Sequence, residues 1–301
     1  MEVSTGHRQT EQVLGDLAGM DTWDGLRILD VLVAGQERAI AAVRAALPAI
    51  DRAATLLAER LEAGARLIYA GAGTSIRIGV QDGSELPETF GLDAARVTYL
   101  IAGGRDAMFE TAGAGEDDVE AGEAAAQVCR PGDVMIAVAA SGSTPYTLAA
   151  ARAATARGAT LIAVVNNPDS PLGQLAHSEI VLRSGPEVIA GSTRMGAGTA
   201  QKAALNLLST LAFIKCGAVH DGLMVEVDAS NAKLKRRAEG IVAKIAGVAP
   251  AEAAAALDQA GGAIKPAVLL CAGAQDPAAA RELLAETGYN LRLALARLAA
   301  A

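Results

Sequence analysis

Two stretches of the chain, Arg66-Leu-Ile-Tyr-Ala-Gly-Ala-Gly-Thr-Ser75 and Val134-Met-Ile-Ala-Val-Ala-Ala-Ser-Gly-Ser-Thr144, are the most informative about its architecture. In each, an apolar run precedes a turn rich in glycine and hydroxyl side chains, which predicts a buried strand, a tight turn and a helix start. Such a turn points backbone N–H groups and hydroxyls at one spot, where the helix dipole also favours an anion. Two such turns in one sheet predict a site for a small phosphorylated ligand.

Further apolar runs predict the rest of the sheet. They alternate with helical patterns, and each is continuously apolar, which is typical of strands buried on both faces of a parallel sheet. The sequence therefore predicts an α/β fold with five strands, at 67–70, 97–101, 134–139, 161–165 and 179–182.

Helical periodicity covers residues 36–63, and Pro48 is expected to divide this segment into two helices. A crossover helix is predicted over 145–157. The segment 199–216 is apolar on all sides, which predicts a helix that is central or lies at a subunit interface.

A change in composition towards the C-terminus predicts the domain organisation. Residues 249–301 contain short alanine- and leucine-rich helices separated by glycines, and Asp276-Pro277 is a typical helix start. We expect a helical segment over 1–50, a main domain over 51–240 and a small helical domain over 245–301.

Composition excludes several classes of protein. The formal net charge of −8 argues against nucleic acid as a partner, since phosphate backbones need a basic face. No apolar run approaches the ~20 residues of a membrane helix, and residues 1–15 lack the apolar core of a signal peptide. We therefore expect a cytoplasmic protein without membrane contact. Neither the three cysteines nor the three histidines have metal-ligand spacing, so no metal site is expected.

Ten blocks, in this order, carry a resemblance to a known family: Tyr69–Ser75, Ser84–Pro87 with Thr89–Gly91, Ile101–Gly104, Gly115–Asp117, Ala139–Tyr146, Asn167-Pro168, Gly185–Arg194, Ala197–Lys202, Asn206–Thr210 and Leu223–Asp228. Over roughly residues 22–240, and more weakly to the C-terminus, the chain resembles the N-acetylmuramic acid 6-phosphate etherases. The resemblance implies a three-layer αβα sugar isomerase (SIS) fold with a five-stranded parallel sheet, a small C-terminal helical module and a homodimer.

The same resemblance implies a carbon–oxygen lyase that needs no metal or organic cofactor. Its substrate is an amino-sugar phosphate whose D-lactyl ether is cleaved by elimination, followed by addition of water. The two family glutamates correspond to Glu85 and Glu116. Removal of a proton at C2, beside an aldehyde, needs a base, and departure of lactate from C3 needs an acid. Glu85 is expected to protonate the lactate and later to activate water, and Glu116 to remove the C2 proton.

Hydroxyl side chains of the two turns are the candidate phosphate ligands. Ser141, Ser143 and Thr144 either bind the phosphate or cap the following helix, because both roles use the same geometry. The same holds for Thr74 and Ser75 of the first turn. More candidates lie in the block 185–194. Glu187 either orients the sugar or joins an ion pair, and Ser192 and Thr193 either bind ligand or cap a helix.

The chain departs from the family pattern at four places. Ile76 stands where the family has glycine, and would be strained if that position required a positive φ. Gly113 replaces a second glutamate, Ser143 replaces an arginine, and the sequence Gln81-Asp-Gly83 differs from the commonest form.

Three alternatives stay open at this point. A sugar-phosphate isomerase of the same fold shares the phosphate turns but lacks the two glutamate blocks. A non-catalytic sugar-phosphate sensor would keep the fold, although retention of both glutamates argues against it. A dinucleotide-binding protein is disfavoured because no G-x-G-x-x-G is followed by a ribose-binding acid.

Overall fold

The computed structural model describes residues 9–110, 113–227 and 232–300 of the chain. Two compact units are present, which we call the sheet unit (Met1–Gly83 and Ala95–Thr210) and the helical unit (Ser84–Ala94 and Leu211–Ala301). The domain bounds expected from the sequence, 1–50, 51–240 and 245–301, remain a prediction. Asp228, the end of the tenth family block, lies outside the described residues.

The sheet unit is built on five parallel strands in the order β2-β1-β3-β4-β5. Leu67 of β1 is in register with Val97 of β2 and Val134 of β3, so the strands begin level with one another. Every apolar run predicted as a strand forms one, which confirms the α/β prediction. The strands are β1 Leu67–Gly71, β2 Val97–Ile101, β3 Val134–Ala139, β4 Thr160–Val165 and β5 Ser178–Val181.

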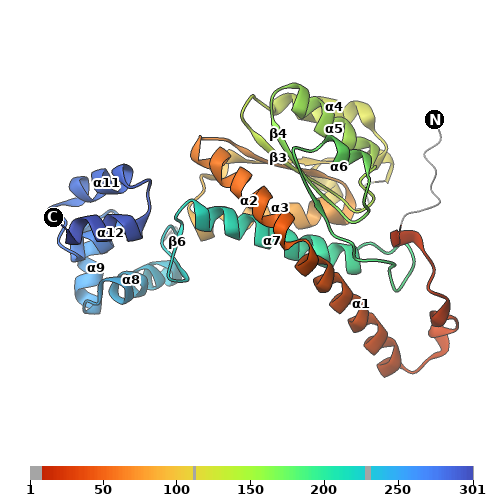
Figure 1. Cartoon of the computed structure of the whole chain (residues 1–301), viewed down its shortest axis with the longest axis horizontal. Helices are drawn as coiled ribbons and strands as arrows, with labels where there is room; N and C mark the ends of the chain where they lie inside the picture. The colour runs from red at the N-terminus through yellow and green to blue at the C-terminus, as the bar shows by residue number, and fades with distance from the viewer. Residues whose placement is uncertain (1–8, 111–112, 228–231, 301) are drawn as a thin grey trace. The chain divides into compact units, whose positions relative to one another are not determined.

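Helices cover both faces of this sheet (Figure 1). One face carries α4, α5 and α6, and the other carries α2 with the sheet-unit parts of α3 and α7. These helices are α2 Leu47–Glu62, α3 Gly73–Phe90, α4 Val119–Ala125, α5 Pro145–Ala156, α6 Pro171–Leu175 and α7 Gly196–Lys215. The sheet is therefore the middle of three layers, as predicted.

Burial on both faces explains why the strand sequences are continuously apolar. Successive side chains of a strand point to opposite faces. On β3, Met135 packs in the core cluster shared with α5, and its neighbour Ile136 is equally buried on the other face. The strands β1, β3 and β4 are buried at every position.

The N-terminal helices begin earlier than predicted. Helix α1 spans Gly25–Ala45 because Asp24 caps it, accepting hydrogen bonds from the N–H groups of Leu26 and Arg27. The predicted break near Pro48 is confirmed, since α1 ends at Ala45 and α2 begins at Leu47. Short 3-10 turns precede α1: η1 Gln9–Glu11, η2 Gly15–Leu17 and η3 Met20–Thr22.

The helical unit has its own core. Buried side chains from α8 to α12, with Val225 and Val227 after β7, form one cluster, and the partly buried Leu223 and Met224 of β7 pack against it. Lys265 lies inside it at 2% exposure and forms an ion pair with Glu226 (2.6 Å). Asp276 caps α11 as its sequence predicted. The elements are β6 Val219–His220, β7 Leu223–Met224, α8 Ala232–Ala246, α9 Pro250–Gln259, α10 Ile264–Cys271, α11 Pro277–Glu286 and α12 Leu291–Ala299.

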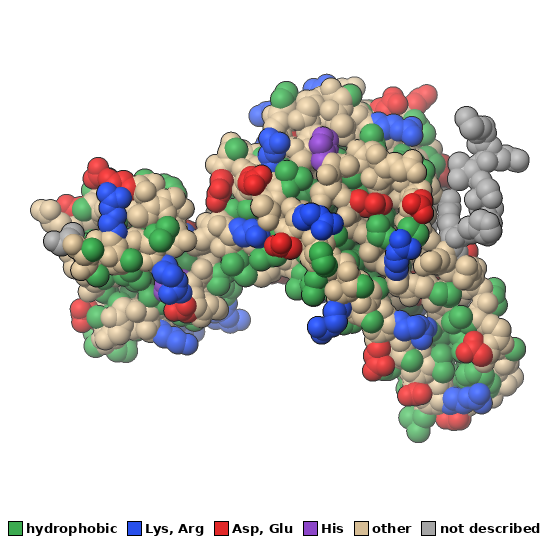
Figure 2. Space-filling view, viewed as in Figure 1, with side chains coloured by type: hydrophobic (Ala, Val, Ile, Leu, Met, Phe, Trp, Pro, Cys, Tyr) green, Lys and Arg blue, Asp and Glu red, His purple; other side chains and the backbone are tan. Residues whose placement is uncertain are grey.

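Acidic and basic side chains are interspersed over the face shown in Figure 2. Within the described residues, no helix on its own has the length and hydropathy required to cross a membrane. The pair α8 and α9, bent by 110°, meets that requirement jointly, by length and composition only.

Candidate functional site

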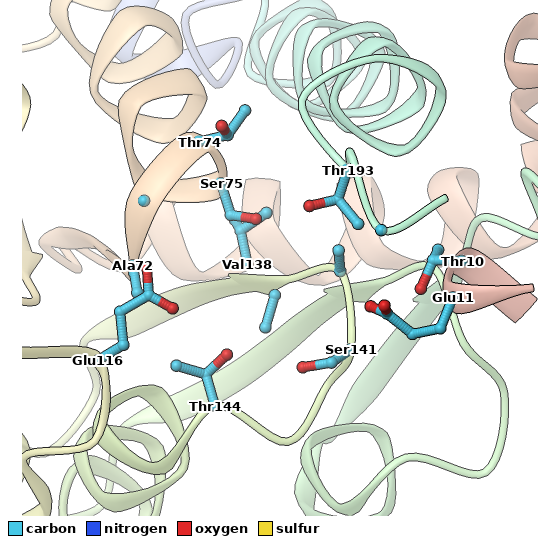
Figure 3. A pocket seen from close by; sticks show the side chains of 14 residues that line it. Thr10, Glu11, Ala72, Thr74, Ser75, Glu116, Val138, Ser141, Thr144 and Thr193 are labelled. Atoms are coloured by element: carbon cyan, nitrogen blue, oxygen red, sulfur yellow. The ribbon is translucent and has the colours of Figure 1, made fainter. Parts of the chain in front are cut away.

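A pocket of about 160 Å³ lies in the sheet unit, beyond the carboxyl ends of β1 and β3. This is where open α/β sheets bind their ligands. Both glycine-rich turns line it, so the two stretches singled out in the sequence meet at one place. Six of the candidate site residues line the pocket: Thr74, Ser75, Glu116, Ser141, Thr144 and Thr193 (Figure 3).

The first turn supplies unpaired backbone donors. Helix α3 starts at Gly73, two residues after β1 ends, and its first internal bond runs from the Ile76 N–H to the Ala72 carbonyl. The N–H groups of residues 73–75 therefore have no partner within the helix. They belong to residues that line the pocket, where the positive end of the helix dipole favours an anion.

The second turn has the same construction. Helix α5 begins at Pro145, and the side chain of its N-cap residue, Thr144, makes no capping bond. The Ser143 N–H donates to the Ser141 Oγ at 3.2 Å, which fixes the direction of that hydroxyl. Ser141 and Thr144 line the pocket, whereas Ser143 does not.

Glu116 enters the pocket from the 3-10 turn η6, Gly113–Glu116. A Cβ on Gly115 would lie 2.8 Å from the Gly103 nitrogen, so η6 rests directly on the turn that follows β2. The Glu116 Oε1 lies 3.0 Å from where a Cβ on Gly73 would be, and Gly73 has a φ of +50°. Glycine at 73 therefore allows the carboxylate to approach the start of α3, where the dipole stabilises a negative charge.

Glu85 does not line this pocket. It lies on α3 with its side chain exposed, ten residues after Ser75. It belongs to the helical unit, whereas the residues that line the pocket belong to the sheet unit. Of the two predicted catalytic glutamates, Glu116 lines the pocket and Glu85 does not.

Glu187 and Ser192 are also outside the pocket lining. Glu187 is 3% exposed, and its carboxylate accepts hydrogen bonds from the N–H groups of Gly196 and Ala197, both at 2.8 Å. It thus caps α7. The residue after Ser192, Thr193, lines the pocket in its place. Neither role for Glu187 considered from the sequence, sugar ligand or ion-pair member, anticipated a helix cap.

Sequence reasoning missed two lining residues, Thr10 and Glu11. They belong to η1, far from the sheet in sequence, and no local pattern marks them. Of the neighbouring candidates Ser192 and Thr193, only the course of the backbone decides which one lines the pocket.

The departures from the family pattern fit the structure. Ile76 lies inside α3, is 1% exposed and packs beneath Gly71, so its side chain faces the core. The positive φ considered for this position is not found: the described non-glycine residues with positive φ are Asp169, Asp221 and Tyr289. Gly113, at the start of η6, has a φ of +50°.

A second polar cluster lies on α3, in the interior of the sheet unit. The buried Asp82 carboxylate accepts hydrogen bonds from Tyr69 (2.7 Å), Asn206 (2.7 Å) and Ser209 (3.1 Å). Burial, together with the nearby Asp82, raises the pKa of Tyr99 to about 12. Burial also raises the pKa of Tyr69, which is a neutral donor joining β1 to α3, while Asn206 and Ser209 join α7 to the same carboxylate.

The described residues contain no group of three or more His, Cys, Asp or Glu side chains placed to hold a metal ion. What the pocket offers chemically is a set of anion-binding N–H and hydroxyl groups beside a carboxylate that can exchange a proton.

Comparisons with known proteins identify the fold and the family. A model of the SIS domain matches residues 106–211, and one of the glucokinase regulatory protein N-terminal SIS domain matches residues 49–154. The fold is thus that of SIS domains, as the resemblance implied.

Several known proteins are similar to the chain over most of its length. The chain is 47% identical to N-acetylmuramic acid 6-phosphate etherase of Symbiobacterium thermophilum over 86% of this chain and 87% of that protein. It is 44% identical to the protein of that name from Deinococcus radiodurans (91% and 92% covered). The corresponding protein of Rubrobacter xylanophilus is 42% identical, over 95% of both chains.

Proposed function

The chain belongs to the N-acetylmuramic acid 6-phosphate etherase family, and we propose that it cleaves the D-lactyl ether of N-acetylmuramic acid 6-phosphate, giving N-acetylglucosamine 6-phosphate and D-lactate. The observation that carries the proposal is the identity of 42–47% to etherases over most of both chains. The pocket supports it, because two N–H-rich turns face a carboxylate.

In this proposal the turns hold the 6-phosphate. Ser141 and Thr144 of the second turn, with Thr74 and Ser75 of the first, supply hydroxyls beside the free N–H groups. Charge-assisted hydrogen bonds of this kind are about twice as strong as neutral ones, so the phosphate anchors the ligand and leaves the sugar to reach the carboxylate.

Glu116 then acts on the open-chain sugar. It takes the proton from C2, and the electron pair left behind is stabilised by the C1 aldehyde as an enolate. That pair forms the C2–C3 double bond as the C3–O bond breaks, and the lactate oxygen receives a proton from Glu85. Water adds to C3, and C2 regains a proton, which completes the exchange of lactate for hydroxide.

We further propose that a second copy of the chain supplies Glu85, since this residue does not line the pocket of its own chain. An exposed apolar stripe on α1 offers a face for such pairing, at the a/d spacing of helix–helix contacts. It consists of Leu26, Leu29, Val33 and Ile40.

The proposed place of action is the cytoplasm, in the recycling of cell-wall amino sugars. This rests on the proposed substrate, a phosphorylated amino sugar derived from peptidoglycan.

Lactate release tests the reaction. Purified protein incubated with N-acetylmuramic acid 6-phosphate should release D-lactate in amounts equal to the N-acetylglucosamine 6-phosphate formed. Conversion of an aldose phosphate to a ketose phosphate without lactate would instead identify an isomerase. Binding of the sugar phosphate without turnover would identify a sensor.

Mixing two inactive variants tests the shared site. If copies pair, Glu85→Gln and Glu116→Gln chains that exchange subunits form mixed dimers in which one of the two sites has both glutamates. About a quarter of the wild-type activity should then return after random exchange. If each chain completes its own site, the mixture stays inactive.

A further inference from the structure

The pocket contains a second carboxylate that the proposed reaction does not use. Glu11 lines it together with Glu116, and Figure 3 shows the two side chains projecting into the pocket from opposite sides, with Ser141 and Thr144 between them. No described residue forms a hydrogen bond or ion pair with the Glu11 side chain. A carboxylate at this position can accept a hydrogen bond from a donor on the ligand.

The backbone beside Glu11 is firmly fixed. The Gln9 N–H donates to the Asn167 Oδ1 at 2.9 Å, and the Gly191 N–H donates to the Thr10 carbonyl at 3.0 Å. Asn167 also donates to the Ala140 carbonyl at 2.9 Å, one residue before Ser141. Residues 9–11 are thus held by the segments that follow β4 and β5, and through Asn167 they are connected to the second turn.

The direction of the Glu11 side chain is set by a close approach to Gly191. A Cβ at Gly191 would lie 2.9 Å from the Glu11 Oε2, and the φ of Gly191 is +74°. Glycine at this position therefore leaves the space that the carboxylate occupies. Gly191 itself lines the pocket, so the carboxylate is held at the wall rather than in solvent.

We propose that Glu11 is a specificity-determining residue, whose carboxylate accepts a hydrogen bond from a sugar hydroxyl near the phosphorylated end of the ligand. A carboxylate can only accept hydrogen bonds, and it repels the phosphate, so its partner must be a donor elsewhere on the ligand. This inference rests on the proposed function, because it assumes that a sugar phosphate occupies the pocket. Glu11 selects ligands that carry a hydroxylated chain over ligands that are anions alone.

Two ligands and two matched variants test this role by calorimetry on the full chain. The ligands are N-acetylglucosamine 6-phosphate and inorganic phosphate. The test variant is Glu11→Gln. The control is Glu62→Gln, an exposed glutamate at the end of α2, just before β1 and so at the opposite edge of the sheet.

Glu11→Gln should raise the Kd of N-acetylglucosamine 6-phosphate about tenfold, through loss of one charge-assisted hydrogen bond. The Kd of inorganic phosphate should stay the same or fall, because a repelling charge has been removed. Glu62→Gln should change neither value. Equal weakening of both ligands would mean that Glu11 only holds the N-terminal segment in place, and no change for either would also overturn the proposal.

The wild-type titration separates this inference from the proposed function. If the wild type binds N-acetylglucosamine 6-phosphate and Glu11→Gln binds it equally well, the proposed function stands and the role of Glu11 is wrong. If the wild type binds inorganic phosphate but not the sugar phosphate, both fail.

Discussion

The two edges of the central sheet use charged side chains in opposite ways. At the amino edge, just before β1 and β3, Arg66 and Asp133 form an ion pair at 2.5 Å. Asp133 also accepts the Arg130 N–H at 2.8 Å, and Arg66 also donates to the Val128 carbonyl at 2.7 Å. At the carboxyl edge, the Glu116 carboxylate has no ion-pair partner among the described residues, and the N–H groups of residues 73–75 have no partner within α3.

This difference shows that satisfied and unsatisfied polar groups have different roles. An ion pair whose hydrogen bonds are all made has no donor or acceptor left for a ligand, so it contributes to stability only. A carboxylate beside free helix N–H groups adds little to the fold, but its proton and its charge remain available for chemistry. Substitutions at the amino edge should therefore change stability, and those at the carboxyl edge should change binding and turnover.

Glu116→Gln should have the greatest effect on activity. Loss of a general base typically costs about 10²–10⁴ in rate, and the amide cannot accept the C2 proton. Incubation with N-acetylglucosamine 6-phosphate in D₂O measures this step, since the wild type should exchange deuterium into C2 and the variant should not. The melting temperature should stay within about 2 °C.

Asp117→Asn is the matched control, because this neighbour is exposed and does not line the pocket. It should exchange deuterium at the wild-type rate. If Glu116→Gln exchanges normally and Glu85→Gln does not, the two glutamates have the reverse of the proposed roles.

Asp133→Ala should destabilise the fold by about 3 kcal/mol, because it leaves the Arg66 guanidinium largely buried without its partner. The affinity of the folded protein for N-acetylglucosamine 6-phosphate should not change. Urea denaturation measures the first effect and calorimetry the second. The exposed pair Lys235–Asp258 gives the contrast, as Asp258→Ala should cost less than about 1 kcal/mol.

The same pair predicts how stability depends on pH. Burial raises the pKa of Asp133, but the hydrogen bonds from Arg66 and from the Arg130 N–H outweigh it, so the pKa lies below its usual range. The stabilisation is therefore complete above the unfolded pKa, about 3.9, and is lost as the pH falls through the lower folded value. The difference in unfolding free energy between wild type and Asp133→Ala should be constant near neutrality and should shrink below about pH 4. A difference that does not shrink as the pH falls below about 4 would contradict this assignment.

The sequence predicted features that depend on nearby residues, and it did not predict features that depend on contacts between distant residues. The strands and the two turns are local features, and apolar runs buried on both faces mark them clearly. The start of α1 was missed, although the cap residue Asp24 and the apolar spacing of Leu26, Leu29 and Val33 are local signals for it. Glu11 lies at the pocket because its neighbours Gln9 and Thr10 form hydrogen bonds with Asn167 and Gly191, more than 150 positions away. No local sequence pattern predicts such contacts.

Ser141→Ala should weaken the binding of N-acetylglucosamine 6-phosphate by about 2 kcal/mol, which is typical of a hydrogen bond to a charged group. Inorganic phosphate should lose affinity to the same extent, in contrast to the Glu11 variant, because Ser141 acts on the anion itself. Ser143→Ala is the comparison within the same turn: its backbone bond to the Ser141 Oγ survives, so a smaller loss is expected. Equal losses in both variants would place the phosphate further along the turn.

Glu187→Gln should have the smallest effect, about 1 kcal/mol of unfolding free energy. The amide keeps one acceptor oxygen for the N–H groups of Gly196 and Ala197 but loses the charge that favours a helix N-terminus. Because Glu187 is buried and does not line the pocket, the Kd of N-acetylglucosamine 6-phosphate should stay within about twofold. A tenfold loss of affinity at unchanged stability would instead assign Glu187 to the ligand, as one of the sequence hypotheses holds. That result would mean that α7 moves on binding, since the carboxylate would have to exchange its helix N–H partners for the sugar.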